Sequence, residues 1–223
     1  MSTDRVNHDE DCHPRNHPNG TKHRKSPAFL CGFLLGAVDS LVSKKKCDRM
    51  IRDDAQSKLD HPNRMSFCIS GLPAERFIPL FALDDAELAP FGAHRTMADE
   101  RPGFPCRVTL ADAERGERVL LLNYEHQPAN TPYRAAHAIY VRESAVQTAR
   151  AIDTIPESLR LRMLSVRAFD AAGMMRDGDL TPGAELATLI ERFLADPATA
   201  YLHVHFAKRG CYAARVDRHE IGS

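Results

Sequence analysis

The chain has 223 residues, in which 30 Lys and Arg balance 30 Asp and Glu, and the isoelectric point is about 7.2. This length allows one domain, or one domain with an appendage. The balanced charge argues against a nucleic-acid or anionic-membrane binder, so we expect neither kind of partner.

Composition changes near residue 65. Residues 1–64 hold five of the eleven His, no Tyr, and 12 Lys and Arg against 9 Asp and Glu, which leaves 18 against 21 for the remainder. They show no sustained helical or strand period. This segment is either a disordered or regulatory extension or an over-extended gene start, and we expect the second, with Met65 as the natural beginning. The apolar run at 28–38 follows a basic KHRK, but it is shorter than the about 20 residues of a membrane span.

Residues 65–223 are expected to form a single globular domain, a comfortable size for one core. Short apolar stretches bounded by turns predict its strands. They are residues 67–70, 107–110, 118–124, 137–142, 164–170 and 201–206, with 211–217 completing a C-terminal hairpin. Residues 127–134 and 174–183 are predicted to be loops, and 157–163 either a short helix or a lead into the next strand.

Two helices are predicted with more definite ends. Asp84 is typical of an N-cap for a short helix that ends at Gly92. Thr181 and Pro182 predict the start of the main helix, at about 181–195, with an apolar stripe on one side. Strands outnumber helices and are often joined by short loops. We therefore predict an α+β fold with a largely antiparallel sheet, one main helix and a closing hairpin.

Six cysteines stand at positions 12, 31, 47, 68, 106 and 211, with no CxxC or CxxxC spacing. This argues against a zinc ribbon, a thioredoxin-type site or a small disulfide scaffold. Reduced thiols and a cytoplasmic location are the expectation. Cys106 and Cys211 each have a basic residue nearby, so a nucleophilic cysteine stays open beside the commoner alternative of inert buried packing.

Ordered motifs carry a family resemblance, among them LLLNYEHQP, HAIYVRE and HVHxAKxGCYAARVDR, where x stands for Phe206 and Arg209 in this chain. From Met65 nearly to its end, the chain resembles a bacterial family catalogued as domain of unknown function 1203. The resemblance also implies a natural start at Met65, where members of that family typically begin. It implies no activity. One departure is Phe206, where a polar residue, often Asn, is expected.

The segment YLHVHF alternates in character, and alternate residues of a strand share a face. The aliphatic side chains are expected to pack on the main helix, and His203 and His205 to share the other face with Tyr201. With a turn at 207–210, His205 is predicted to pair with Tyr212 and His203 with Ala214. That arrangement predicts a polar floor with room above it.

A metal site is the first hypothesis for this face. His203 and His205 can present two imidazoles to one ion such as zinc, and a catalytic zinc takes three protein ligands and an open position. The third ligand is His137, which we favour, or His126 or Glu125. The alternative is that both strand histidines are half-exposed polar residues on a solvated face.

Metal-free acid–base catalysis is the second hypothesis, with Glu125, His137, His203, His205 and Arg167 as candidates. They supply a carboxylate base, imidazole acids and a guanidinium that can hold an anion, which suits phosphodiester or ester hydrolysis. The alternative is that Glu125 and Arg167 form structural ion pairs.

A non-enzymatic module that binds a small molecule or a partner is the third hypothesis, and the sequence does not decide between enzyme and binding module. The candidate binding residues have aromatic or polar side chains and lie in or next to the motifs above. They are Tyr124, His126, Arg142, Tyr201 and Tyr212. The oligomeric state stays open.

Overall fold

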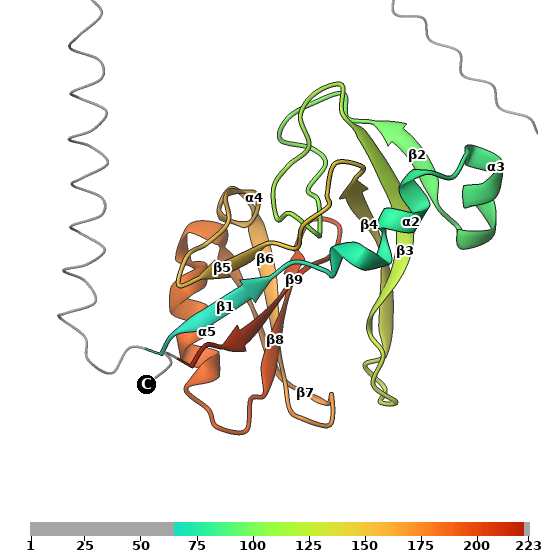
Figure 1. The fold of residues 1–223 in the computed structure, drawn as a ribbon. Helices are drawn as coiled ribbons and strands as arrows, with labels where there is room; N and C mark the ends of the chain where they lie inside the picture. The colour runs from blue at the N-terminus through green and yellow to red at the C-terminus, as the bar shows by residue number, and fades with distance from the viewer. Residues whose placement is uncertain (1–64, 221–223) are drawn as a thin grey trace, which may run out of the picture. The chain divides into compact units, whose positions relative to one another are not determined.

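The computed structural model describes residues 65–220, which form two antiparallel sheets joined by short helices (Figure 1). The expectations for residues 1–64, including the apolar run at 28–38, lie outside this described range. The six-stranded sheet has the order β5-β1-β9-β8-β6-β7, with β5 (Arg150–Ile152), β1 (Phe67–Ser70), β9 (Tyr212–Arg218), β8 (Tyr201–Phe206), β6 (Met163–Phe169) and β7 (Met175–Pro182). The three-stranded sheet has the order β2-β3-β4, with β2 (His94–Met97), β3 (Arg118–Gln127) and β4 (Ala135–Arg142).

The described helices are short except for one. They are α2 (Ile78–Phe81), α3 (Asp85–Leu88), α4 (Glu157–Arg160) and α5 (Leu186–Leu194), with 3-10 turns at Ala74–Arg76, Ala89–Phe91 and Gly183–Glu185. The predicted α+β class, main helix and closing hairpin are confirmed. None of these helices is long and apolar enough to cross a membrane.

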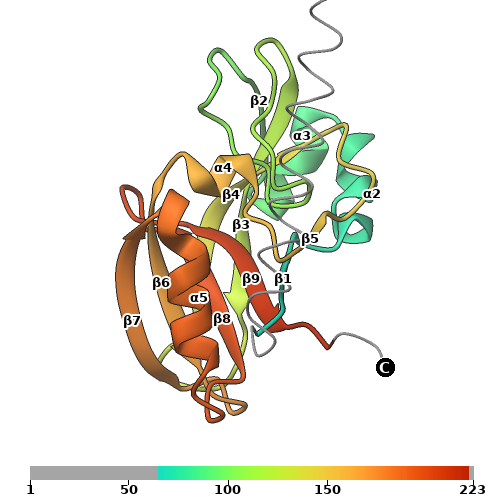
Figure 2. The ribbon, with the colours of Figure 1, turned by 90° about the vertical axis from the view of Figure 1, so that its left-hand side faces the viewer.

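The helix α5 covers one face of the six-stranded sheet (Figure 2). Its apolar residues recur at helical spacing, so Leu186, Ile190 and Leu194 are all buried on the same side. They join the strand residues Leu202 and Val204 in one core cluster. The aliphatic face of β8 therefore packs on the helix, as its alternation predicted.

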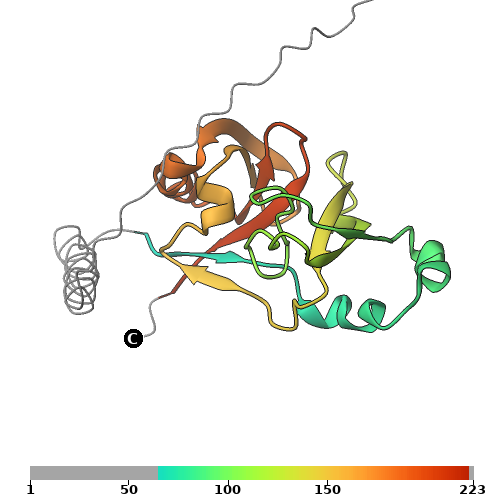
Figure 3. The same cartoon turned by 90° about the horizontal axis from the view of Figure 1, so that it is seen from above.

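The β3–β4 hairpin lies on the opposite side of β8 and β9 from α5 (Figures 1 and 3). A second core cluster joins Leu120 and Leu122 of β3 to Ile139 and Val141 of β4. Tyr212 of β9 belongs to the same cluster and is buried, so it links the two sheets. This packing covers the face of β8 that carries the histidines.

The predicted helix start at Asp84 and end at Gly92 are confirmed. Asp84 Oδ1 accepts hydrogen bonds from the backbone N–H groups of Ala86 and Glu87 at 2.9 Å, and the Glu87 carboxylate accepts from the Asp84 N–H. Gly92 has a φ of 60°, which a residue without a Cβ adopts easily.

The predicted strand at 107–110 is wrong. The Leu110 N–H donates to the Cys106 carbonyl at 3.0 Å, and Leu110 has a φ of 54°, so this segment is a tight turn. Its carbonyl groups serve other segments: those of Arg107 and Val108 accept from the N–H groups of Leu72 and Ala149. The apolar residues of this turn are buried. A short run of buried apolar residues looks the same in the sequence whether it forms a turn or a strand.

The predicted loop at 174–183 is also wrong, because most of it is the edge strand β7. Its residues are largely exposed, so no alternation of apolar and polar residues marks it. Thr181 belongs to this strand and does not cap the helix. A 3-10 turn follows, and α5 begins after Glu185, which makes no side-chain capping bond. The short strands β2 and β5, also poor in buried apolar residues, were not predicted.

The hairpin β8–β9 departs from the predicted register by one residue. His205 faces Tyr212 as expected, but the register shifts between Val204 and His205, so that His203 faces Arg215 instead of Ala214. A β-bulge of this kind places an extra residue on one strand and turns its side chains. The small residue that was expected to leave open space opposite His203 is therefore replaced by the long side chain of Arg215.

Candidate metal site formed by three histidines

The outer face of β8 is not exposed to solvent. His203 is 2% exposed and His205 is fully buried at 0%. The β3–β4 hairpin and Tyr212 cover them, so the alternative of half-exposed histidines on a solvated face is excluded. Two buried imidazoles need partners, because burying a polar group without a hydrogen bond costs about 1–3 kcal/mol.

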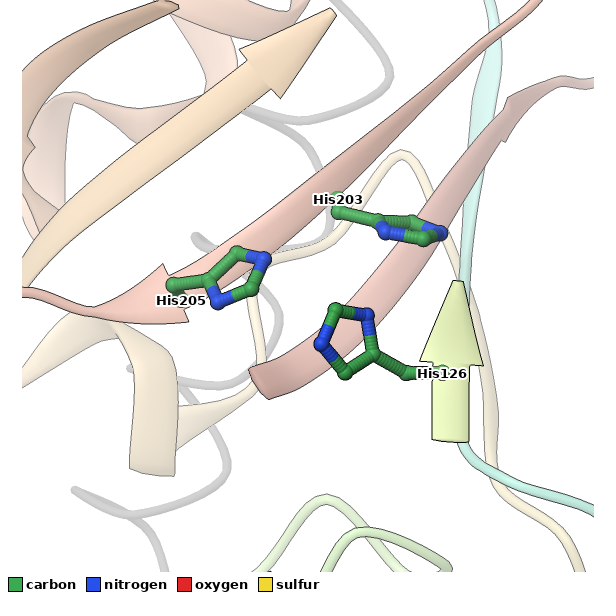
Figure 4. A group of neighbouring side chains, drawn as sticks. All are labelled: His126, His203 and His205. Carbon is green, nitrogen blue, oxygen red and sulfur yellow. The ribbon is translucent and has the colours of Figure 1, made fainter. Parts of the chain in front are cut away.

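His126 reaches these two histidines from β3 (Figure 4). The sequence predicted a strand ending at Tyr124, with His126 just beyond its end, but β3 continues to Gln127. Glu125 pairs with Ala136 and Gln127 pairs with Ala135, so His126 is the extra residue of a β-bulge. Bulges commonly re-aim one side chain, and here that side chain points at β8.

One ligand nitrogen from each of His126, His203 and His205 lies within 4.8 Å of the others. The ring centroid of His126 is 5.4 Å from that of His203 and 5.1 Å from that of His205. Three enclosed ring nitrogens have no hydrogen-bond partner among the described residues. They are His126 Nδ1, His203 Nδ1 and His205 Nε2, one from each ring. A buried group of three histidines that could hold a metal is thus present.

The remaining nitrogens of two rings are hydrogen bonded in a way that orients them. His205 Nδ1 lies 3.0 Å from the Gly210 carbonyl oxygen, which only accepts, so Nδ1 carries the proton and Nε2 keeps its lone pair in the neutral ring. His126 Nε2 lies 2.7 Å from His137 Nδ1. When His126 donates in that bond, its Nδ1 likewise keeps a free lone pair.

The environment holds these imidazoles neutral. Burial, the neighbouring His137 and the Arg167 charge lower the pKa of His126 to about 4. Burial is also the main cause that lowers the pKa of His203 to about 3 and that of His205 to about 2. Burial lowers the pKa of His137 as well. At neutral pH all are therefore in the form that binds metals.

Aromatic rings enclose the group. Tyr212 lies nearly parallel to the His126 ring, with centroids 4.7 Å apart. Phe169 and Tyr201 lie 5.0 and 5.2 Å from the His203 ring. The Tyr201 hydroxyl accepts a hydrogen bond of 2.7 Å from the Gln127 side chain, so this buried hydroxyl has a partner. Burial raises the pKa of Tyr212, which keeps its hydroxyl protonated.

Arg167 contributes a positive charge to the site. It lies on β6, opposite His203 in the register, and its charge lowers the pKa of every histidine of the group. Its guanidinium has no hydrogen bond or ion pair with any residue in the described part of the chain. Burial lowers its own pKa. An unpaired, partly buried guanidinium is suited to an anion.

Other candidates from the sequence lie elsewhere. Glu125 points outward and forms an exposed ion pair with Arg134. Arg142 donates to the Glu117 carboxylate at 2.8 Å, and the Tyr124 hydroxyl accepts from Arg76 at 3.0 Å. Glu125 and Arg142 alternate with the core-facing residues of β3 and β4, so their side chains point away from the histidines. Tyr124 lies opposite His137 in the register and packs against the second core cluster.

The two cysteines are both engaged away from the histidine rings. Cys106 is buried, and its Sγ accepts from the Arg142 N–H at 3.3 Å. The Cys211 Sγ accepts from Arg107 Nη2 at 3.1 Å. The described cysteines are free thiols, as their spacing predicted.

The fold and the site define an α+β protein with an enclosed three-histidine group between two antiparallel sheets. The chain belongs to the family described as "Protein of unknown function (DUF1203)", whose model matches residues 103–218, just over half of the chain. The resemblance noted in the sequence is confirmed over this span, which is shorter than the expected one from Met65. Comparison with curated proteins and with solved structures found no match.

Proposed function

We propose that this protein binds one divalent transition-metal ion through His126, His203 and His205, and uses it to hydrolyse an ester or phosphoester of a small anionic substrate. The observation that carries the proposal is the set of three enclosed ring nitrogens, one per histidine, without a hydrogen-bond partner in the described residues. Nearly all buried polar groups in proteins are paired, and one ion would pair all three.

The size of the group supports a metal after a small contraction. Zinc–nitrogen bonds of about 2.0–2.1 Å place tetrahedral ligands about 3.3 Å apart. The ligand atoms here lie within 4.8 Å of one another, so modest rotation of the rings brings them into range. Imidazole donors suit zinc, copper, iron and nickel. A three-histidine set leaves one position for water or substrate, which is the arrangement of catalytic zinc sites.

The surroundings support the same assignment. Ligating histidines usually donate their second N–H to a carbonyl or a comparable acceptor, which fixes the ring orientation. His205 does so with the Gly210 carbonyl, and His126 has His137 in the corresponding place. His137 is therefore proposed as a positioning residue and not as a ligand.

The proposed chemistry uses the open position and the free cation. A divalent ion held by these histidines would lower the pKa of a coordinated water to about 7, which would supply a nucleophile at neutral pH without a carboxylate base. Arg167 would hold the negative charge of the substrate beside it. The exposed position of Glu125, already paired with Arg134, accords with a mechanism that does not need it.

Metal-free acid–base catalysis is less well supported. A general base works best when its pKa lies near the operating pH. The histidine pKa values of about 2 to 4 make these rings weak bases at pH 7. The same low values favour metal binding, because protons then compete little with the ion.

The test is metal content and affinity. We expect the purified chain to bind about one Zn²⁺, measured by elemental analysis and titration calorimetry, and the variants His126→Ala, His203→Ala and His205→Ala to lose that binding. His137→Ala should weaken it by about 10- to 100-fold. His94→Ala removes an exposed histidine of β2 and is the matched control with unchanged binding.

The catalytic part is tested separately. With Zn²⁺ bound, the protein should hydrolyse p-nitrophenyl esters or phosphoesters, lose that activity in a chelator, and show a higher KM for anionic substrates in Arg167→Gln. Absence of bound metal, or wild-type affinity in His203→Ala, would contradict the metal site. Tight metal binding without turnover of any such ester would contradict the hydrolytic role and leave a metal-binding module.

A further inference from the structure

A cavity of about 320 Å³ lies at the turn between β8 and β9. Among the described residues, its lining combines basic side chains with apolar ones and includes no Asp, Glu or His. The lining residues with basic or thiol side chains are Arg107, Arg162, Lys208, Arg209 and Cys211. Since none of the three clustered histidines lines it, the cavity is separate from the proposed metal site.

Arg107 is the most constrained residue of this cavity. It is only 2% exposed, yet no carboxylate among the described residues pairs with it. Its guanidinium donates to the carbonyls of Tyr212 and Pro105 and to the Cys211 sulfur. These bonds use three of its five N–H donors, so two remain. Burial lowers its pKa, because the charge has been removed from water without a counter-charge.

Two further positive charges stand at the rim. Lys208 and Arg209 are exposed, and neither forms an ion pair with a described residue. Arg162 differs, because Asp112 holds it through two hydrogen bonds of 2.7 and 2.9 Å. The cavity therefore carries three positive charges that nothing in the described structure neutralises.

The rest of the lining is apolar. Phe206 lies between two guanidinium groups, with the Arg107 and Arg162 carbons 5.0 and 5.3 Å from its ring centroid. Pro105, Tyr140 and Met163 add apolar surface. A volume of about 320 Å³ equals that of roughly ten water molecules, at the lower end of small-molecule sites.

We propose that this cavity is a binding site for a small organic oxyanion, a carboxylate or phosphate attached to an apolar or aromatic group. Arg107 would hold the oxyanion with its two remaining donors, assisted by Lys208 and Arg209. The apolar part would lie against Phe206 and Tyr140. This site does not depend on the proposed metal or on hydrolysis.

Cys211 supplies a built-in reporter, because its thiol lies in the cavity and is partly accessible. The full chain is treated with iodoacetamide in a chelator, so that the histidine group holds no metal, and alkylation is followed by mass spectrometry. Trypsin releases Cys211 of the wild-type chain in the peptide GCYAAR, residues 210–215, and that of the Lys208→Ala/Arg209→Ala variant in residues 193–215, in both cases apart from the other cysteines. Benzoate and phenyl phosphate serve as probes. Benzyl alcohol, which has the aromatic group without the charge, and inorganic phosphate, which has the charge without the aromatic group, serve as control compounds.

We expect benzoate or phenyl phosphate to slow the alkylation of Cys211 in a saturable way, and each control compound to do so far less. Which of the two probes protects better distinguishes a carboxylate from a phosphate ligand. The double variant Lys208→Ala/Arg209→Ala should weaken protection by about five-fold or more, since two charge contacts are lost. Both replaced residues are exposed, so the fold should persist.

Arg115→Ala/Arg160→Ala is the matched control. It removes the same charge from exposed positions outside the cavity and should leave protection unchanged. The proposal is overturned if neither aromatic anion protects Cys211, if benzyl alcohol protects as well as benzoate, or if both double variants weaken protection equally.

Discussion

His126 reaches the other two histidines because β3 bulges at that residue. The sequence named His203 and His205 as a pair and favoured His137 for the third position, with His126 and Glu125 as alternatives. Local pattern could not choose among them, since Glu125 and His126 are neighbours and a regular strand would point them to opposite faces. The bulge in β3 and its packing against β8 bring His126, and not Glu125, next to His203 and His205.

The burial of His205 leads to a prediction about pH. Its folded-state pKa is about 2, against about 6.5 in an unfolded chain, so below pH 6.5 only the unfolded chain takes up the proton. The stability from this depressed pKa is complete above pH 6.5 and is lost as the pH falls. Between pH 6.5 and 5.0 the loss should be about 2 kcal/mol for this one group.

The measurement is the free energy of unfolding by denaturant at pH 6.5 and 5.0, in a chelator. Wild type should lose about 2 kcal/mol more than His205→Gln over this interval, because the variant has no imidazole to protonate. His94→Gln, which removes an exposed histidine, should behave as wild type. An equal loss in wild type and His205→Gln would mean that His205 takes up its proton in the folded state as well.

The elements differ in how far local pattern predicts them. The helix α5 and the strand β8 were predicted because each has a marked apolar face that the core buries. The edge strand β7 was missed because its residues are largely exposed, and backbone pairing with β6 alone makes it a strand. The turn at 107–110 was predicted to be a strand because its buried apolar residues resemble those of a strand in the sequence, although the backbone there is not extended.

The contribution of α5 can be measured at one position. Ile190 is fully buried against the sheet, so Ile190→Ala should lower the free energy of unfolding by about 2–5 kcal/mol, through lost burial and a residual cavity. Thr188→Ala changes an exposed residue of the same helix and should shift it by less than about 0.5 kcal/mol. Denaturant unfolding followed by circular dichroism compares the two, and similar losses would contradict the assigned buried face.

At the scale of the whole molecule, residues 65–220 contain an extensive hydrophobic core, whose described members extend from Met65 to Val216. We therefore predict that a chain beginning at Met65 folds without residues 1–64. Its thermal midpoint should agree with that of the full chain within a few degrees, measured by circular dichroism, and its Zn²⁺ affinity should be the same. A fragment that is unfolded or aggregates would contradict the predicted boundary.

By itself, the sequence determined which segments carry a buried apolar face, that strands outnumber helices, that the chain closes with a hairpin, and that two histidines share one side of its first strand. These properties follow from local periodicity, which residues a few positions apart encode. Only the tertiary structure decided that this histidine face is covered, that His126 completes the group and that Arg107 is buried beside a cavity. Each of those depends on segments that are distant in the sequence, whose approach is decided by packing and by bulges in the strands.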